Sequence, residues 1–276
     1  MAHCGLYWTA CSGSFDNKQI MIRLSVNVNK IATLRNARGG TLPDVVAAAR
    51  TCIAAGCHGI TVHPRPDARH ITFQDVHDLA AIMTVEFNIE GYPSPDFLEL
   101  VHKVKPTQVT LVPDAPGLLT SNAGWNLVRG GVDWLRDVLA KLAQAGIRTS
   151  LFLEPDPEQV RCAQKMGANR IELYTGPYAA AFGTPGGNKI LALHREAAHL
   201  ARSIGVGVNA GHDLDLVNIP AYARAVKGLQ EVSIGHALVS DALYMGLRRA
   251  VRAYLKALGS EPLAASRKFA KPRLLN

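Results

Sequence analysis

This sequence of 276 residues has no apolar run long enough to cross a membrane. A membrane-spanning helix needs roughly 18 or more consecutive apolar residues, and no segment supplies them. The first twenty residues also lack the basic start and the apolar stretch of a secretory signal peptide. We therefore expect a protein without membrane partners, in which residues 1–20 form a disordered leader ahead of the fold.

Cysteine is scarce and its spacing is uninformative for a disulfide or zinc motif. The five cysteines are an odd number and include no C-x-x-C pair. Such usage is typical of a reduced chain in the cytoplasm, because disulfide frameworks belong to oxidising compartments. We therefore predict a cytoplasmic protein.

The sequence does not lack apolar material. Hydrophobic residues make up 48% of the chain and charged residues 19%, which excludes the disordered and fibrous classes. The length suits one barrel-type domain of about 250 residues with short tails.

Acidic residues are absent from the last stretch of the chain, where positive charge collects. The formal net charge is +8, from 30 Lys and Arg against 22 Asp and Glu. A basic tail is predicted over residues 261–276, and within it residues 262–276 hold no Asp or Glu and carry half of the excess, on Arg267, Lys268, Lys271 and Arg273. The rest of the chain is only mildly basic, which argues against a nucleic-acid-binding surface and favours small anionic partners such as phosphate esters.

Short β-branched runs alternate with helical patterns along nearly the whole chain. The predicted strands are 22–29, 59–64, 84–90, 108–113, 148–154, 170–175, 205–210 and 231–236. Their starts advance by about 30 residues per unit, which is the size that eight βα units need in a barrel. We therefore predict a single-domain (β/α)8 TIM barrel over residues 21–260, closed by a helix that carries Leu243 and Leu258. The alternative, a doubly wound open sheet, is disfavoured because the first turn has no G-x-G-x-x-G.

Within the strands, apolar residues alternate with polar or small ones. Thr61, Asn88, Glu172 and Asn209 belong to the polar set, while their neighbours along each strand are apolar. In a barrel the apolar set packs beneath the helices and the other set faces the axis. We therefore expect a polar barrel interior.

Titratable residues collect where the strands end, the position at which barrels place their active sites. His63 and Glu90 follow neighbouring strands, His212 lies across the barrel, and Glu172 lies one step inside the wall. Imidazole and a carboxyl group in a partly dry site can move protons at neutral pH. Each residue alone is as often structural as catalytic, but the set of four predicts acid/base chemistry.

Two glycine-containing turns follow the seventh and eighth strands, at 209–212 and 234–237. Barrels commonly hold phosphate there on backbone N–H groups. Arg35, Arg38 and Arg65 supply positive charge at the same face, with surface ion pairs as the alternative.

A zinc site is the second chemical reading. His63, His70, His212 and His236 could ligate zinc together with Glu90 or Glu154. Barrel metallohydrolases use H-x-H on the first strand, whereas this strand offers Asn27-Val28-Asn29. We therefore predict no metal.

Seven ordered blocks resemble the pyridoxine 5'-phosphate synthase family, the ring-closing enzymes of the deoxyxylulose-phosphate-dependent route to vitamin B6. The resemblance runs from about residue 23 to residue 258 and leaves both tails outside. The blocks are NVNKIATLRNAR at 27–38, GITVHPRPDARHI at 59–71, EFNIEG at 86–91, TLVPD at 110–114, IELYTG at 171–176, VNAGH at 208–212 and SIGHAL at 233–238.

The resemblance implies a cytoplasmic homo-octamer of (β/α)8 barrels that needs no cofactor. It implies the condensation of 1-deoxy-D-xylulose 5-phosphate with 3-amino-2-oxopropyl phosphate, giving pyridoxine 5'-phosphate, phosphate and water. By the same resemblance His63 and Glu90 are general bases, His212 is the proton donor, and Glu172 stabilises the transition state. The residues matched to substrate binding are Asn27, Asn29, Lys30, Arg38, Arg65, His70, Thr120, Asp213, Gly235 and His236.

The chain departs from the family pattern at two places. An Asp-His pair that contacts deoxyxylulose phosphate becomes Asn29-Lys30, and a glycine after the catalytic histidine becomes Asp213. These changes leave open a paralogue that acts on another phosphorylated ketose or amine. A non-catalytic barrel that assembles or binds nucleic acid is suggested only by the net charge.

Overall fold

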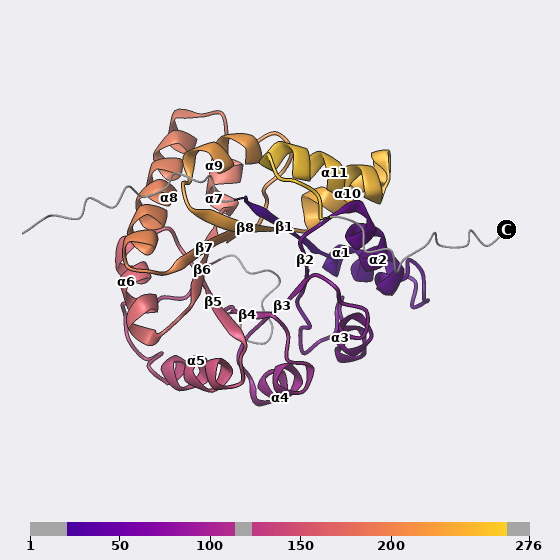
Figure 1. The fold of residues 1–276 in the computed structure, drawn as a ribbon, viewed down its shortest axis with the longest axis horizontal. Helices are drawn as coiled ribbons and strands as arrows, with labels where there is room; N and C mark the ends of the chain where they lie inside the picture. The colour runs from indigo at the N-terminus through magenta and orange to yellow at the C-terminus, as the bar shows by residue number, and fades with distance from the viewer. Residues whose placement is uncertain (1–20, 114–122, 264–276) are drawn as a thin grey trace, which may run out of the picture.

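The computed structural model describes residues 21–113 and 123–263. Eight parallel strands follow one another around a closed barrel, and β8 pairs with β1 to complete it. Figure 1 shows the strands at the centre with the helices arranged around them. The predicted (β/α)8 barrel is therefore confirmed.

All eight predicted strands are present, with ends shifted by up to two residues. The strands are β1 (Arg23–Asn27), β2 (Gly59–Val62), β3 (Glu86–Gly91), β4 (Gln108–Leu111), β5 (Arg148–Leu153), β6 (Arg170–Tyr174), β7 (Gly207–Gly211) and β8 (Leu229–Ile234). The helices are α1 (Asn29–Asn36), α2 (Val45–Ala55), α3 (Phe73–Ala80), α4 (Pro95–Val104), α5 (Trp134–Gln144), α6 (Pro157–Met166), α7 (Gly176–Ala180), α8 (Pro185–Ser203), α9 (Ile219–Ala225), α10 (His236–Met245) and α11 (Leu247–Leu258). The predicted leader over residues 1–20 lies outside the described residues, as does the predicted tail beyond residue 263.

Helix starts and ends follow local capping chemistry. Asp44 caps α2 by accepting hydrogen bonds from the backbone N–H groups of Val46 and Ala47, at 2.8 and 3.1 Å. Gly56 ends the same helix with a φ of +104°, a conformation that side-chain-bearing residues rarely adopt. These signals place the helices between the strands.

The closing helix is not continuous as predicted. Gly246, with a φ of +82°, separates α10 from α11. Because the helix axis changes there, Leu243 is 71% exposed, while Val251 and Leu258 on α11 pack into the core. Apolar residues continue at helical spacing on both sides of Gly246, so the spacing alone predicts one helix. The positive φ of Gly246 is what divides it into two.

The barrel interior is polar, as the strand alternation predicts. The apolar neighbours Val26, Ile60 and Ile171 are fully buried beneath the helices. Inside, hydrogen bonds run from strand to strand: Ser25–Thr61, Asn88–Thr61, Thr110–Asn88, Asn209–Gln108 and Asn209–Glu231. Within β4, Gln108 also donates to Thr110. A buried polar group is costly unless it is hydrogen-bonded, so these pairs make a polar interior compatible with stability.

At the amino ends of the strands, arginine and glutamate close the barrel. Arg148 donates to Gln108 at 2.9 Å and forms an ion pair with Glu86, which also pairs with Arg23. The fold therefore leaves the opposite end, where the strands finish, as the open mouth.

Candidate active site

A cavity of about 310 Å³ lies at the carboxyl ends of the strands. All but two of the predicted site residues line it: Asn27, Asn29, Lys30, His63, Arg65, His70, Glu90, Glu172, His212, Asp213, Gly235 and His236. These residues come from six separate parts of the sequence, on or after β1, β2, β3, β6, β7 and β8. The barrel therefore brings them to one place.

Arg38 and Thr120 are the two exceptions. Thr120 lies outside the described residues. Arg38 is exposed and follows the end of α1, and it does not line the cavity. Since a helix rises about 1.5 Å per residue, α1 carries the chain away from the mouth after Lys30.

His63 and Glu90 face each other across the cavity wall. His63 Nδ1 lies 3.9 Å from Glu90 Oε2, and Asn27 donates to the same oxygen at 3.5 Å. β1 and β3 flank β2, which explains why residues at these three strand ends meet. A proton can pass between an imidazole and a carboxylate at this separation after a small movement.

Burial lowers the pKa of His63 well below its usual value, and the positive charges of Arg65, His70 and Arg69 lower it further. The pKa of His70 falls to about 4 for the same reasons, burial first and then Arg65. His63 is therefore neutral at pH 7 and available to accept a proton.

Glu172 is buried at the inner wall. Burial raises its pKa well above the usual value, and the negative charges of Glu90 and Glu231 raise it further, while a hydrogen bond with Thr110 opposes the shift. Gly211 on the neighbouring β7 makes room for this carboxyl group, because a Cβ at Gly211 would lie 2.3 Å from Glu172 Oε1. Position 211 therefore requires glycine, because a side chain there would collide with the carboxyl group of Glu172.

His212 and Asp213 follow β7 in a turn where both residues have positive φ, +86° and +58°. His212 Nδ1 lies 2.9 Å from Asp213 Oδ2, and Tyr174 packs against the imidazole edge-to-face at 5.2 Å. The Asp213 carboxylate is therefore directed at the histidine ring.

Positive charge surrounds the rim. Lys30, Arg65, Arg69 and His236 line the cavity, and α10 begins at His236 directly after β8. The unpaired N–H groups of a helix start favour anions. Arg35 does not contribute, because its guanidinium donates to Asp75 Oδ2 at 2.9 Å and ties α1 to α3.

The alternative of a zinc site finds no ligand set among the described residues. Residues 21–113 and 123–263 contain no group of three or more His, Cys, Asp or Glu side chains arranged to hold a metal ion. In the same ranges, no helix is long and apolar enough to span a membrane.

The family model described as "Pyridoxal phosphate biosynthesis protein PdxJ" matches residues 24–260. The chain belongs to the PdxJ family. A relative from Bacteroides thetaiotaomicron named pyridoxine 5'-phosphate synthase is 55% identical over 86% of this chain and 100% of its own length. A relative of the same name from Cytophaga hutchinsonii is 52% identical over 86% of this chain and 99% of its own. A thiamine phosphate pyrophosphorylase structure from Pyrococcus furiosus shares the fold at a TM-score of 0.56 and 15% identity, covering 88% of this chain and 98% of that one.

The structure shows how Asn29 and Asp213 are used at the two departures from the PdxJ-family pattern, whereas nothing in it explains Lys30 beyond its place in the cavity lining. Asn29 Oδ1 accepts a hydrogen bond from the backbone N–H of His63 at 3.0 Å, a role in which an aspartate oxygen would serve equally. Asn29 is also the first residue of α1 and not the inward-facing strand residue that was predicted. At position 213, the carboxylate points toward the His212 ring, and the backbone N–H that glycine would supply is still present.

Several cavity residues were not predicted from the PdxJ-family blocks or the strand ends. Thr33 lies one turn beyond Asn29 on α1, and Arg69 precedes His70. Thr110 lies on β4. Helical spacing could have identified Thr33. Arg69 lies in a loop, for which the sequence has no periodicity to follow.

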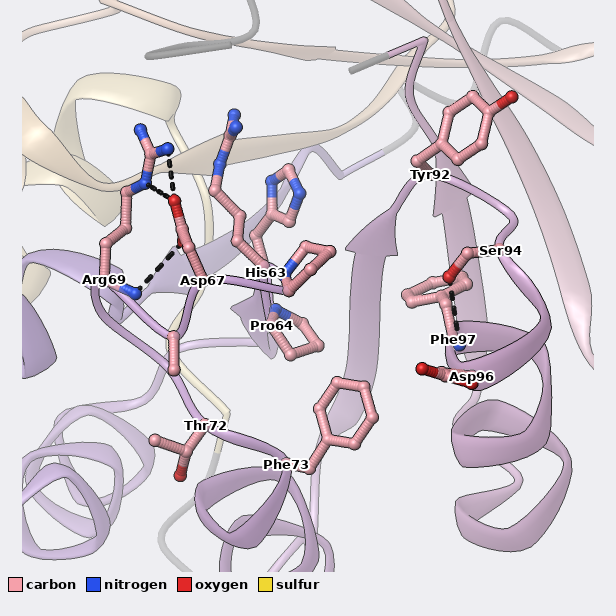
Figure 2. Close-up of a pocket in the computed structure, with 13 residues that line it drawn as sticks. His63, Pro64, Asp67, Arg69, Thr72, Phe73, Tyr92, Ser94, Asp96 and Phe97 are labelled. Atoms are coloured by element: carbon pink, nitrogen blue, oxygen red, sulfur yellow. Dashed lines mark hydrogen bonds and ion pairs between the residues drawn. The ribbon is translucent and has the colours of Figure 1, made fainter. Parts of the chain in front are cut away.

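A second cavity of about 340 Å³ adjoins the first and shares His63, Arg65 and Arg69 with it. Figure 2 shows Pro64, in the loop after β2, and Phe73, at the start of α3, facing Tyr92, in the loop after β3, and Phe97 on α4. This cavity extends the mouth between α3 and α4 and has a more apolar wall.

Proposed function

We propose that this protein condenses 1-deoxy-D-xylulose 5-phosphate with 3-amino-2-oxopropyl phosphate to form pyridoxine 5'-phosphate, inorganic phosphate and water. One observation carries the proposal: His63, Glu90, Glu172 and His212 line a single cavity of about 310 Å³ at the barrel mouth. Membership of the PdxJ family and relatives named for this activity support it.

His63 and Glu90 are proposed as the bases. Imine formation and ring closure each require removal of protons from substrate carbon, nitrogen or oxygen atoms, and a general base accepts them. The lowered pKa of His63, caused first by burial, keeps the imidazole unprotonated at pH 7. Glu90 lies within 3.9 Å, so protons can be shared between the two groups as successive steps proceed.

Glu172 is proposed to stabilise positive charge on the reacting nitrogen. Burial raises the pKa of Glu172, which favours its protonated form when no positive charge lies beside it. A cationic intermediate formed beside it would favour the ionised carboxylate. The Glu172 carboxylate then offsets the positive charge on the nitrogen only when that charge develops. Stabilisation of this kind favours the transition state over the bound substrate.

The phosphate groups are proposed to lie at the cationic rim. Asn27, Gly235, His236 and the backbone N–H of Asp213 would hold the aminoketone phosphate, whereas Arg38, which the resemblance matches to the same phosphate, does not line the cavity. Asn29, Lys30, Arg65, His70 and Thr120 would hold the deoxyxylulose phosphate. Arg65 lies where the two cavities meet, and a guanidinium can bind phosphate through two parallel hydrogen bonds. Arg69 lies there too and forms an ion pair with Asp67.

We also propose that the catalytic barrel spans residues 21–260 and that a basic tail follows it. The protein is further proposed to be a cytoplasmic homo-octamer that uses no cofactor and binds no nucleic acid. The paralogue is a weaker alternative, since Asn29 keeps its hydrogen bond to His63 and Asp213 keeps its backbone N–H.

The test is a product assay on the purified full chain. With both substrates, pyridoxine 5'-phosphate should appear by its absorbance and mass, and omission of either substrate should abolish it. Absence of product, or turnover of a different phosphorylated ketose or amine at a higher kcat/KM, would contradict the proposal and favour the paralogue.

A further inference from the structure

We propose that Asp213 is a positioning residue: its carboxylate holds the Nδ1–H of His212 and thereby presents Nε2 to the substrate. The inference rests on the proposed function, because it assigns His212 as the proton donor of that reaction. It assigns to the carboxylate of Asp213 a role that the backbone N–H of the same residue cannot fill.

The contact depends on an unusual backbone. His212 and Asp213 are consecutive residues with φ of +86° and +58°, a region that favours glycine and tolerates aspartate better than most residues. In this conformation Asp213 Oδ2 comes within 2.9 Å of His212 Nδ1. A residue kept in a strained conformation beside a cavity calls for a reason in the chemistry of that cavity.

Neighbouring side chains hold the turn in place. The Thr175 hydroxyl lies 2.6 Å from the carbonyl oxygen of Gly211 and also contacts that of His212. Asn218 Nδ2 donates to the carbonyl oxygen of Asp213 at 3.2 Å. On the other side of the imidazole, Tyr174 packs at 77° to the ring plane and restricts its rotation.

The direction of the hydrogen bond follows from charge. The pKa of Asp213 is lowered, first by its hydrogen bond with His212 and also by the positive charges of His236 and Lys30. An ionised carboxylate can only accept hydrogen bonds, so His212 Nδ1 must carry the proton. In neutral His212 the second nitrogen, Nε2, then holds the lone pair, and in the charged form both nitrogens carry protons.

This arrangement fixes which proton is transferred. Charged His212 gives the proton on Nε2 to a substrate oxygen or nitrogen, and the bonding electron pair stays on Nε2. The neutral ring that remains has its proton on Nδ1, where the Asp213 carboxylate already accepts it. No rotation or proton exchange is needed before Nε2 takes up the next proton.

Asp213→Gly tests the idea, since glycine accepts the positive φ and keeps the backbone N–H. In solid-state ¹⁵N NMR of histidine-labelled protein, with His212→Gln used for assignment, the fraction of His212 protonated at Nδ1 should fall. With both substrates, kcat should drop about 10- to 100-fold, as expected when a catalytic histidine loses its orienting partner, while both KM values stay within about twofold.

Asp213→Asn keeps the shape of the side chain but replaces the carboxylate with an amide, which can donate to Nδ1 as well as accept from it. It should therefore leave the Nδ1-protonated fraction below the wild-type value and kcat reduced. Asp215→Asn is the matched control: its Oδ1 accepts from Val217 and Asn218 and has no contact with His212, so both readouts should stay at wild-type values. An unchanged NMR signal or an unchanged kcat in Asp213→Gly would overturn the inference, as would an equal loss in Asp215→Asn. If wild-type protein makes no product, the proposed function fails, and the NMR comparison, which needs no substrate, still decides the positioning role.

Discussion

At the scale of single residues, the site depends on a few positions where one atom more or less decides the geometry. Gly211 lies against Glu172, and His212 and Asp213 follow in a strained turn. Strand alternation was sufficient to predict Glu172, and the strand ends were sufficient for His63, Glu90 and His212. The side-chain contact between His212 and Asp213 could not be predicted, because it depends on two positive φ angles that the residue types do not demand.

Gly211→Ala should reduce kcat about 10- to 100-fold, because the added Cβ would displace the Glu172 carboxyl group from its position. The expected loss of stability is small, since the nearest atom belongs to the end of a flexible side chain. Steady-state kinetics and urea denaturation measure the two effects.

Gly205→Ala is the control for that experiment. Gly205 has a φ of +78° and open space around it, so alanine there should cost about 1 kcal/mol of unfolding free energy and leave kcat unchanged. Equal effects of the two substitutions on kcat would mean that Glu172 does not need its present position.

Glu90→Gln and His212→Ala should each lower kcat at least about 100-fold, because each removes a group proposed to transfer protons. Circular dichroism should show an intact barrel, since both side chains lie at the cavity and not in the apolar core. Near-normal turnover in either variant would mean that the acid/base groups are wrongly assigned.

At the scale of elements, the helices locate the loops that form the cavity. α3 begins with a reciprocal cap: Thr72 accepts from the backbone N–H of Asp75 at 3.1 Å, and Asp75 accepts from that of Thr72 at 2.8 Å. Asp75 also binds Arg35 on α1. The positive charge of Arg35, read from the sequence as a contribution to phosphate binding, is used in this packing contact, and no pattern in the sequence pairs residues 40 positions apart.

Thr72→Ala should lower the free energy of unfolding by about 1 kcal/mol, because the backbone N–H of Asp75 loses its partner at the helix start. Thr51→Ala at a half-buried position on α2 is the control, because Thr51 caps no helix, and should stay within about 0.5 kcal/mol of wild type. Urea denaturation compares the two variants, and equal changes would argue against a contribution from the cap.

At the scale of the whole molecule, the barrel buries histidines as well as apolar side chains. His194 is fully buried, contacts the Tyr222 hydroxyl at 2.9 Å through Nδ1, and leaves Nε2 without a hydrogen bond among the described residues. Burial lowers its pKa to about 4. The eight-strand count and spacing made the architecture predictable, whereas no pattern in the sequence distinguishes this buried imidazole from an exposed histidine on the same helix.

Protonation of His194 couples stability to pH. Below about 6.5 the unfolded chain takes up a proton that the folded chain does not, so stability is full above pH 6.5 and falls as the pH approaches 4. The contribution of this group approaches about 3 kcal/mol at the acid end of that window.

Denaturation midpoints at pH 7 and pH 4.5 measure the effect. His194→Gln should show a smaller loss between the two pH values than wild type, and His199→Gln, an exposed histidine on the same helix, should show the wild-type loss. Parallel pH profiles for all three proteins would contradict the assignment of the acid sensitivity to His194.

The central claim is that one barrel mouth joins two phosphorylated substrates and expels one phosphate. The most direct measurement is a time course in which pyridoxine 5'-phosphate and inorganic phosphate are quantified together after both substrates are mixed with the purified protein. We predict that the two products rise in equal amounts and that neither forms when one substrate is omitted. Phosphate release without pyridoxine 5'-phosphate, or no release at all, would contradict the account.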